Sequence, residues 1–292
     1  IPLPLFFSPC DYHGHYAYSS LRVVLTFVSR PTLHDKLREQ IGPPRADADG
    51  QGPRIAVVWG IGGVGKSQLV LDYHLRHRHE YSASFWVDAS RKQTIDRDFL
   101  AISKVLFNVP DSTKDDVRVE DAILAVKKWF SGGSGRWIFV FDGADNIGEP
   151  ALEGNVDITH YFPDVSSIDI ILVSRSGRVA KMVHEPVRVA ELETEQAKHL
   201  FLARAGLGPT IARDAIAEEI VTTLGCLALA LSLSGTYVSK TARLKKNLDE
   251  YLKEYRQRRK QILSRKPALV KEYGESVLTT WETTYDAIVQ GG

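Results

Sequence analysis

Long hydrophobic runs are missing from this sequence: no stretch of 18 or more apolar residues occurs. The opening residues 1–7 are apolar, but they are too few for a signal peptide and no basic flank precedes them. These absences argue against a transmembrane helix of the usual length and against a secretory signal. We therefore expect no membrane partner.

Cysteine is scarce as well. The chain contains only Cys10 and Cys226, which form neither a disulfide framework nor the close spacing of a metal site. This usage is typical of a reducing compartment, so we expect a cytoplasmic protein. Because the sequence begins at Ile1 and not at Met, we also expect an excised part of a longer protein.

Internal repeats and low-complexity tracts are absent. Of the 292 residues, 43% are hydrophobic and 9% aromatic, which is enough to build ordinary globular cores. The length predicts about two domains.

The net charge is close to zero, at +1, but it is unevenly distributed. Residues 240–266 hold eleven Lys and Arg against three Asp and Glu, so this segment carries +8 and the remainder −7. A basic surface for nucleic acid or an acidic membrane is one interpretation. We favour a solvated face on a long helix at 245–263, because apolar residues recur at helical spacing: Leu248, Tyr251, Leu252, Tyr255, Ile262 and Leu263.

The most specific motif is Gly60-Ile61-Gly62-Gly63-Val64-Gly65-Lys66-Ser67, which matches G-x-x-x-x-G-K-[ST] directly after the apolar run Ile55–Trp59. Glycines allow backbone N–H groups to approach phosphate oxygens, and the positive end of the following helix faces them. In this motif the lysine reaches the β- and γ-phosphates and the hydroxyl ligates Mg²⁺. A glycine-rich turn that merely joins two elements is the alternative, and we favour a nucleotide-binding loop.

Helices and strands alternate after this loop. We expect helices at 66–79, 95–107 and 119–130 and strands at 84–88, 137–142 and 168–173, with an earlier helix at 32–41. The rest of the first fifty residues is expected to be irregular. This alternation predicts an α/β fold, a parallel sheet flanked by helices with ligands at the carboxyl ends of its strands.

From about residue 193 the periodicity becomes purely helical. Helices are expected at 194–205, 211–224, 227–237 and 245–263. A small helical domain therefore follows the sheet domain.

Three polar residues lie at or just after the ends of predicted strands. Asp142 is placed to hold Mg²⁺, or to cap the turn that follows; we favour the metal role. Asp145 is a candidate general base or another cap, and the sequence does not separate the two. Arg175 is a candidate sensor of a γ-phosphate or a surface ion pair, and we favour sensing because its fixed charged fork suits phosphate.

Five segments in this order resemble the motifs of an NB-ARC domain, a module of the STAND class of P-loop NTPases in NOD-like receptors. They are Phe27-Val28-Ser29-Arg30, the phosphate loop, Phe141-Asp142-Gly143-Ala144-Asp145, Leu172-Val173-Ser174-Arg175 and Leu224-Gly225-Cys226-Leu227-Ala228-Leu229-Ala230-Leu231. The closing Ser276-Val277-Leu278-Thr279-Thr280-Trp281-Glu282 looks most like the fungal branch. The resemblance covers about residues 20–292.

The resemblance implies a set of site residues. Adenine would contact Phe27, Val28 and Arg30; the phosphates would contact Gly62, Gly63, Val64, Gly65, Lys66, Ser67 and Gln68; a lid over base and ribose would begin at Leu227 and Ala228. Ser67 and Asp142 would hold Mg²⁺, and Lys66, Asp142, Asp145 and Arg175 would act in any hydrolysis. The implied cofactors are ADP or ATP, dATP being a further option, and Mg²⁺.

Two residues depart from the family pattern. The family usually has proline where this chain has Ala228, which implies a looser lid contact. Many relatives carry paired acids after the strand, whereas Gly143 follows Asp142 here, which leaves Asp145 or nothing as the base and argues against rapid hydrolysis.

The implied domain organisation has four parts. Residues 1–20 form an irregular N-terminal segment, 21–190 the P-loop domain, 191–264 the helical lid domain, and 265–292 a linker and the start of a truncated winged-helix domain. In the first part, we favour a surface loop over a metal site at His13 and His15.

The implied function is a signalling switch in innate immunity and programmed cell death. The ADP form would be closed, exchange for ATP would permit self-association, hydrolysis would be slow, and effector and sensor domains would lie outside this sequence. Two alternatives remain open: an AAA-like ATPase acting on nucleic acid through the basic helix, which we disfavour, and a nucleotide-binding scaffold without hydrolysis.

Overall fold

The computed structural model describes residues 12–16, 22–42, 52–109, 117–132, 135–147 and 156–265, with side chains as far as 258. The expectations for residues 1–11, Cys10 among them, and for the closing segment 276–282 lie outside these ranges. The chain divides into two compact units: 1–23, 30–60 and 66–188 form the first, and 24–29, 61–65 and 189–292 form the second.

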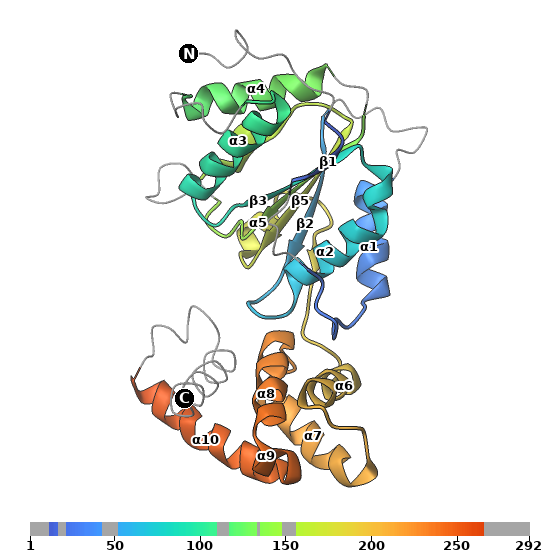
Figure 1. The fold of residues 1–292 in the computed structure, drawn as a ribbon, viewed down its shortest axis with the longest axis vertical. Coiled ribbons are helices and arrows are strands. Elements are labelled where there is room, and N and C mark those ends of the chain that lie inside the picture. Colours follow the sequence, from blue (N-terminus) through green and yellow to red (C-terminus); the bar gives the residue numbers. More distant parts are fainter. Residues whose placement is uncertain are drawn as a thin grey trace. The chain divides into compact units, whose positions relative to one another are not determined.

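The first unit contains a six-stranded sheet in the order β1-β3-β4-β5-β2-β6, and every neighbouring pair is parallel (Figure 1). The strands are β1 Gly14–Tyr16, β2 Arg54–Trp59, β3 Ala83–Asp88, β4 Trp137–Asp142, β5 Ile168–Ser174 and β6 Val187–Arg188. The apolar runs of the sequence become the central strands, and all seven residues of β5 are buried. Strands buried on both faces are typical of parallel sheets, so the predicted α/β fold is confirmed.

Helices cover both faces of this sheet. Figure 1 shows α3 and α4 on one side and α1 and α2 on the other. Their bounds are α1 Pro31–Ile41, α2 Lys66–His77, α3 Lys92–Leu106, α4 Val119–Ser131 and the short α5 Gly177–Ala180, with 3₁₀ turns at Arg78–Glu80 and Ile158–Tyr161.

Aromatic rings fill the core between the sheet and the pair α3 and α4. Phe85 and Phe139 stack with ring centroids 4.8 Å apart, and Phe130 meets Phe139 edge-on at 5.4 Å. Phe99 from α3 stacks on Phe141 at 6.4 Å. These rings are almost completely buried, and aromatic packing of this kind fixes the helices against the strands that lead to the site.

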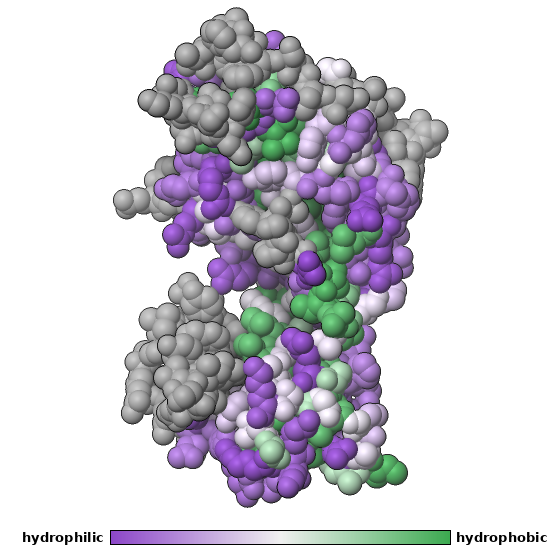
Figure 2. Space-filling model, in the orientation of Figure 1, coloured by the Kyte–Doolittle hydropathy of each residue, from purple (hydrophilic) through white to green (hydrophobic). Residues whose placement is uncertain are grey.

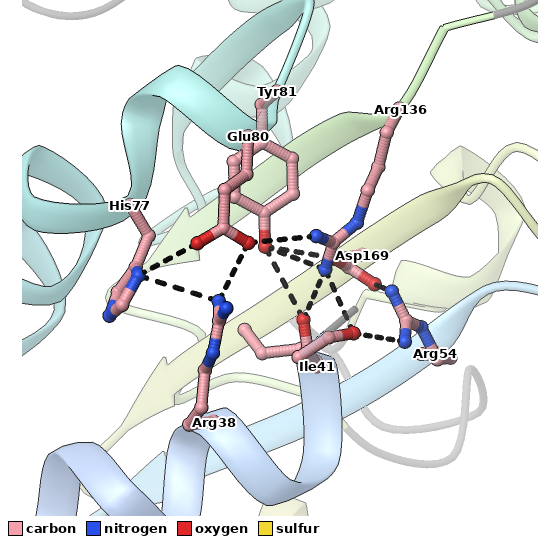
Figure 3. A network of polar contacts seen from close by, with 9 residues as sticks. Arg38, Ile41, Arg54, His77, Glu80, Tyr81, Arg136 and Asp169 are labelled. Atoms are coloured by element: carbon pink, nitrogen blue, oxygen red, sulfur yellow. Dashed lines mark hydrogen bonds and ion pairs between the residues drawn. The ribbon is translucent and has the colours of Figure 1, made fainter. Parts of the chain in front are cut away.

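A charged network closes the amino edge of the sheet, at the opposite ends of the strands from the loop that follows β2 (Figure 3). Asp169 on β5 has no exposed side-chain surface and pairs with Arg136 at 2.6 Å and Arg54 at 2.7 Å. The Tyr81 hydroxyl donates to the same carboxylate at 2.8 Å, and its ring lies 4.5 Å below the Arg136 guanidinium. A buried carboxylate is tolerated here because two guanidinium groups neutralise it.

The same network fixes the end of α1. The carbonyl oxygens of Ile41 and Gly42 accept hydrogen bonds from Arg136 at 2.5 and 3.0 Å, and Arg54 donates to Gly42 as well. Cations are favoured at a helix carboxyl end, where carbonyls lack partners within the helix. Figure 3 shows the two arginines converging on this helix end.

One strand lies where an irregular segment was expected. Residues Gly14–Tyr16 form β1, which pairs in parallel with β3, so the expectation of irregular structure is wrong for these three residues. His15 lies in this strand and not in a loop, although it is exposed, as expected for a surface position. Its Nδ1 lies 2.6 Å from the Ser84 hydroxyl on β3, and its ring meets His74 edge-on at 5.5 Å.

In the part of the second unit that the structure describes, residues 194–265 form helices joined by short connections, as expected. Its helices are α6 Thr194–Ala205, α7 Ile211–Thr223, α8 Ala228–Lys240, α9 Ala242–Lys246 and α10 Leu248–Arg265. The expectation of a single helix at 245–263 is therefore wrong, because the helix is interrupted at Asn247, whose backbone is extended. The Asn247 side chain accepts from the Asp249 amide at 3.2 Å and caps the new helix.

Close packing joins α6 and α8. A Cβ on Gly235 would lie 2.6 Å from the Arg204 Cβ and 2.7 Å from the Phe201 carbonyl oxygen, so only glycine permits this approach. Polar residues cover most of the visible surface of both units, with hydrophobic residues in scattered patches (Figure 2). Among the described residues, no helix has the length and hydropathy needed to cross a membrane.

Candidate nucleotide-binding site

The glycine-rich loop joins the carboxyl end of β2 to the first residue of α2, Lys66. Gly63 and Gly65 have φ values of 81° and 96°, in the left-handed region that favours glycine. Around Gly65 the nearest heavy atom to an added Cβ is the Ala228 Cβ, at 3.9 Å. Backbone conformation, and not crowding, therefore requires glycine there, and the loop leads into a helix amino end that favours anions.

Lys66 is buried at the base of this loop. Its ammonium donates to the Gly60 carbonyl oxygen at 2.9 Å, and its exposed fraction is only 8%. Burial lowers the pKa of Lys66, and Arg175 acts in the same direction, whereas Asp145 and Asp142 raise it. The lysine thus carries a poorly hydrated positive charge that a phosphate would stabilise.

Ser67 and Asp142 meet across the sheet edge. The Ser67 hydroxyl donates to Asp142 Oδ1 at 2.9 Å. Burial raises the pKa of the Asp142 carboxyl, Ser67 and the Gly143 amide lower it, and the neighbouring Asp88 raises it further. A hydroxyl and a carboxylate side by side are oxygen donors of the type that Mg²⁺ uses together with phosphate oxygens and water.

This donor set fits Mg²⁺ bound with a nucleotide better than a cation held by the protein alone. Within the described ranges, no group of three or more His, Cys, Asp or Glu side chains is arranged to hold a metal. Mg²⁺ commonly keeps several waters and takes one or two protein oxygens plus phosphates. The residues present therefore suit a Mg²⁺–nucleotide complex.

Asp145 and Arg175 form an ion pair at the ends of β4 and β5. Asp145 Oδ2 accepts from Arg175 Nε at 2.6 Å, and Oδ1 accepts from the Arg175 amide at 2.5 Å and the Ser174 hydroxyl at 3.0 Å. Burial raises the pKa of Asp145, but the contacts with Arg175 and Ser174 outweigh it, and the pKa lies below its usual range. Asp145 is thus an ionised partner of the predicted sensor.

Several predicted residues belong to the second unit. Within it, the amide of Leu229, in the first turn of α8, donates to the Gly63 carbonyl oxygen at 2.9 Å. Leu227 precedes α8, and Ala228 is its first residue, a position that also accepts proline. This contact brings the predicted lid residues next to the loop residues of the same unit.

The predicted adenine residues precede α1. The Phe27 amide donates to the Val24 carbonyl oxygen and closes a turn, Val28 follows this turn, and Arg30 comes directly before α1. Gln68, in the first turn of α2, donates to the Arg22 carbonyl oxygen at 3.3 Å. Contacts of these residues with a base remain a prediction.

The sequence analysis gave no role in the site to three groups that the structure places there. The Ser174 hydroxyl and the Leu229 amide lay inside quoted motifs but received no role, and Asp88 was treated only as the end of a strand. Asp88 pairs in register with Asp142, so its carboxylate adds negative charge beside the candidate metal ligand. The signal for Asp88 was an acid that ends an apolar strand, the same signal that identified Asp142.

A search of curated proteins found no match. Among the solved structures, the Walker-type ATPase PABY2304 of Pyrococcus abyssi shares the fold, with 14% sequence identity and a TM-score of 0.52; the match covers 84% of this chain and 76% of that chain. The Aeropyrum pernix ORC2 protein in ADPNP–ADP complexes also shares it, with 13% sequence identity and a TM-score of 0.53; the match covers 82% of this chain and 70% of that chain.

A third solved structure is the STAND protein PH0952 of Pyrococcus horikoshii, which has a tetratricopeptide repeat sensor; identity is 14%, the TM-score is 0.46, and the match covers 85% of this chain and 35% of that chain. The family comparison is more specific than any of these. It matches the NB-ARC domain over residues 46–209, more than half of the sequence and the whole stretch from the phosphate loop to α6. The chain therefore belongs to the NB-ARC domain family of nucleotide-binding P-loop NTPases.

Proposed function

We propose that this chain is the nucleotide-dependent switch of a NOD-like receptor. In this proposal ADP maintains a closed form, exchange for ATP favours an open form that self-associates, and slow hydrolysis resets the switch. The observation that carries it is Arg175, which lies at the end of β5, interacts electrostatically with Lys66, and is held in place by Asp145. Only ATP offers such a group a γ-phosphate.

Each of these residues would have its own role in nucleotide binding. Lys66 and the loop amides bind the phosphates, and their buried positive charge attracts the anion into the site. Ser67 and Asp142 would hold Mg²⁺, which neutralises phosphate charge when bound. Arg175 then supplies the difference between the two nucleotides, typically about 1–3 kcal/mol for a coupled site.

Slow hydrolysis is favoured by the backbone at Gly143. Its φ of 78° lies in the left-handed region, so an acidic residue at this position would be strained. The paired acids of many relatives therefore have no counterpart here. This observation also supports the second candidate, a scaffold that binds nucleotide and never hydrolyses it.

The nucleic-acid alternative receives less support from the basic segment. Arg243 pairs with Glu250 at 3.2 Å and also with Glu254, and Arg256 pairs with Glu219 at 2.6 Å. Acidic partners on the same helices and on α7 neutralise part of the charge that a phosphate backbone would need. We interpret this segment as a solvated helix face.

The test is to denature the purified chain and identify any released nucleotide by chromatography. Thermal unfolding of the native chain with Mg-ATP and Mg-ADP is measured in parallel, because a bound ligand raises stability by mass action. We expect near-stoichiometric ADP, and stabilisation by both nucleotides that Lys66→Ala abolishes. An empty chain that neither nucleotide stabilises would overturn the proposal.

Turnover separates the switch from the scaffold. A switch should hydrolyse ATP slowly in the presence of Mg²⁺ and lose this turnover in Asp142→Asn, whereas a scaffold has none to lose. Stimulation of turnover by DNA or RNA would instead favour the nucleic-acid alternative.

A further inference from the structure

Asp145 was a candidate general base, but its surroundings indicate another role. We propose that Asp145 is a positioning residue that orients Arg175 and so determines how well the site distinguishes ATP from ADP. This inference rests on the proposed function, because it needs a site that binds both nucleotides.

The geometry first accounts for both oxygens of the carboxylate. Oδ1 accepts from the Arg175 amide and the Ser174 hydroxyl, and Oδ2 accepts from Arg175 Nε. A general base needs an oxygen that meets the attacking water and a pKa near the working pH. Asp145 has a lowered pKa, and donors already occupy its oxygens, so it is a poor base.

The same contacts suit a positioning role. They attach Asp145 to both the backbone and the side chain of Arg175, so the direction of the guanidinium is fixed from two points. The Arg175 side chain is 43% exposed, and an exposed arginine without such contacts samples many rotamers. Fixing it before the nucleotide arrives reduces the entropy lost on binding.

The choice of nitrogen also matters. Asp145 takes Nε, and the two Nη atoms form the opposite edge of the planar fork, the edge suited to bidentate recognition of phosphate. Arg175 can therefore keep Asp145 while it contacts a γ-phosphate. ADP lacks a γ-phosphate, so orienting Arg175 raises the affinity for ATP and not that for ADP.

The test compares Asp145→Asn with the parent chain, after bound nucleotide has been removed. Calorimetric titration measures the Kd for Mg-ADP and for the Mg complex of a non-hydrolysable ATP analogue. We expect affinity for the analogue to fall about tenfold, a typical loss for a charge-assisted contact, with ADP affinity within about twofold of the parent. Asp121→Asn is the matched control, because Asp121 pairs with Arg118 Nε at 2.9 Å on an exposed helix end.

Two further variants keep the inference testable if Asp145→Asn is unstable. Ser174→Ala removes one donor to the same oxygen, and we expect a smaller loss in the same direction. In Arg175→Ala, adding Asp145→Asn should cause no further loss, because the residue to be oriented is gone. Full additivity of the two losses would overturn the inference.

The outcomes separate this inference from the function on which it rests. If the parent chain binds neither nucleotide, the proposed function fails. If the parent binds both and Asp145→Asn keeps its ratio of ATP to ADP affinity, only the positioning role fails. Loss of turnover with unchanged affinities would identify Asp145 as the base and overturn the inference.

Discussion

Replacing Asp169 with alanine should destabilise the sheet unit strongly although the residue lies far from the phosphate loop along β5. The substitution removes the carboxylate that pairs with Arg136 and Arg54 and accepts from the Tyr81 hydroxyl. Three donors at the amino edge of the sheet would lose their common acceptor. Two of them are cations held close to the fully buried position of Asp169.

The size of the effect follows from burial. Removing one partner of a buried ion pair costs about 3–5 kcal/mol, because the remaining charge is left without compensation. Here the Arg136 and Arg54 side chains are 17% and 25% exposed, so water offsets part of the loss. We therefore expect a loss of about 2–4 kcal/mol in the free energy of unfolding. For a domain of this size that is a fall in Tm of roughly 5–15 °C.

Urea denaturation followed by tryptophan fluorescence is a suitable assay. Trp59, Trp86, Trp129 and Trp137 all belong to the first unit, and Trp137 directly follows Arg136. Asp121→Ala provides the control, because its partner Arg118 is exposed and water screens their ion pair, so its removal should cost much less.

A loss in Asp169→Ala no larger than that in the Asp121→Ala control would refute this reasoning. It would mean that water solvates the two guanidinium groups as favourably as the carboxylate did. The triple replacement of Asp169, Arg136 and Arg54 by apolar residues is informative in either case. It should recover part of the stability, because no buried charge is then left unpaired.

Three further predictions concern the site and the β1 edge. Gly65→Ala should cost about 1–2 kcal/mol through its φ of 96° and weaken nucleotide binding, both measurable by thermal unfolding with and without Mg-ATP. Asp142→Asn should leave the stability of the nucleotide-free chain unchanged or raise it, because burial raises the pKa of this carboxyl, yet remove Mg²⁺-dependent stabilisation by ATP; a large loss without ligand would contradict this. Burial, with His15 and Arg78, lowers the pKa of His74 to about 4, below its unfolded value, so the folded state should lose roughly 3 kcal/mol as pH falls from 6.5 to 4. Denaturation across this range should show a flatter profile in His74→Gln.

Most of the fold was predictable because its signals are local. The strand predicted at 137–142 is β4 and the helix predicted at 194–205 is α6, with the same bounds. Both were predictable because a long apolar or periodic segment carries its own secondary-structure signal. The three residues of β1 carry no such pattern, and β6 has only two residues. Pairing with β3 and β2, which no local signal reveals, creates these two strands.

The break between α9 and α10 was missed for a different reason. A capping signal was present, with Asn247 followed by Asp249 and Glu250 in the first turn of α10. The apolar spacing of residues on both sides masked it, because helical periodicity continued across the break. Capping chemistry should therefore outweigh periodicity where the two conflict.

The site could be predicted as a set of residues but not as a set of contacts. The motifs identified Lys66, Asp142 and Arg175. They did not show that Asp145 forms an ion pair with Arg175, which is 30 residues away in sequence. That contact exists because β4 and β5 are neighbours in the sheet and their carboxyl ends meet at one edge. Register between strands is a tertiary property, so the sequence offered only a general base or a cap as roles for Asp145.

The two edges of the sheet hold buried charges with different partners. At the amino edge the carboxylate of Asp169 has two arginine partners, although burial still raises its pKa. At the carboxyl edge burial lowers the pKa of Lys66 and raises that of Asp142, so both charged forms are disfavoured before a ligand binds. A phosphate would stabilise the first and Mg²⁺ the second, so a magnesium–nucleotide complex would compensate both groups at this edge.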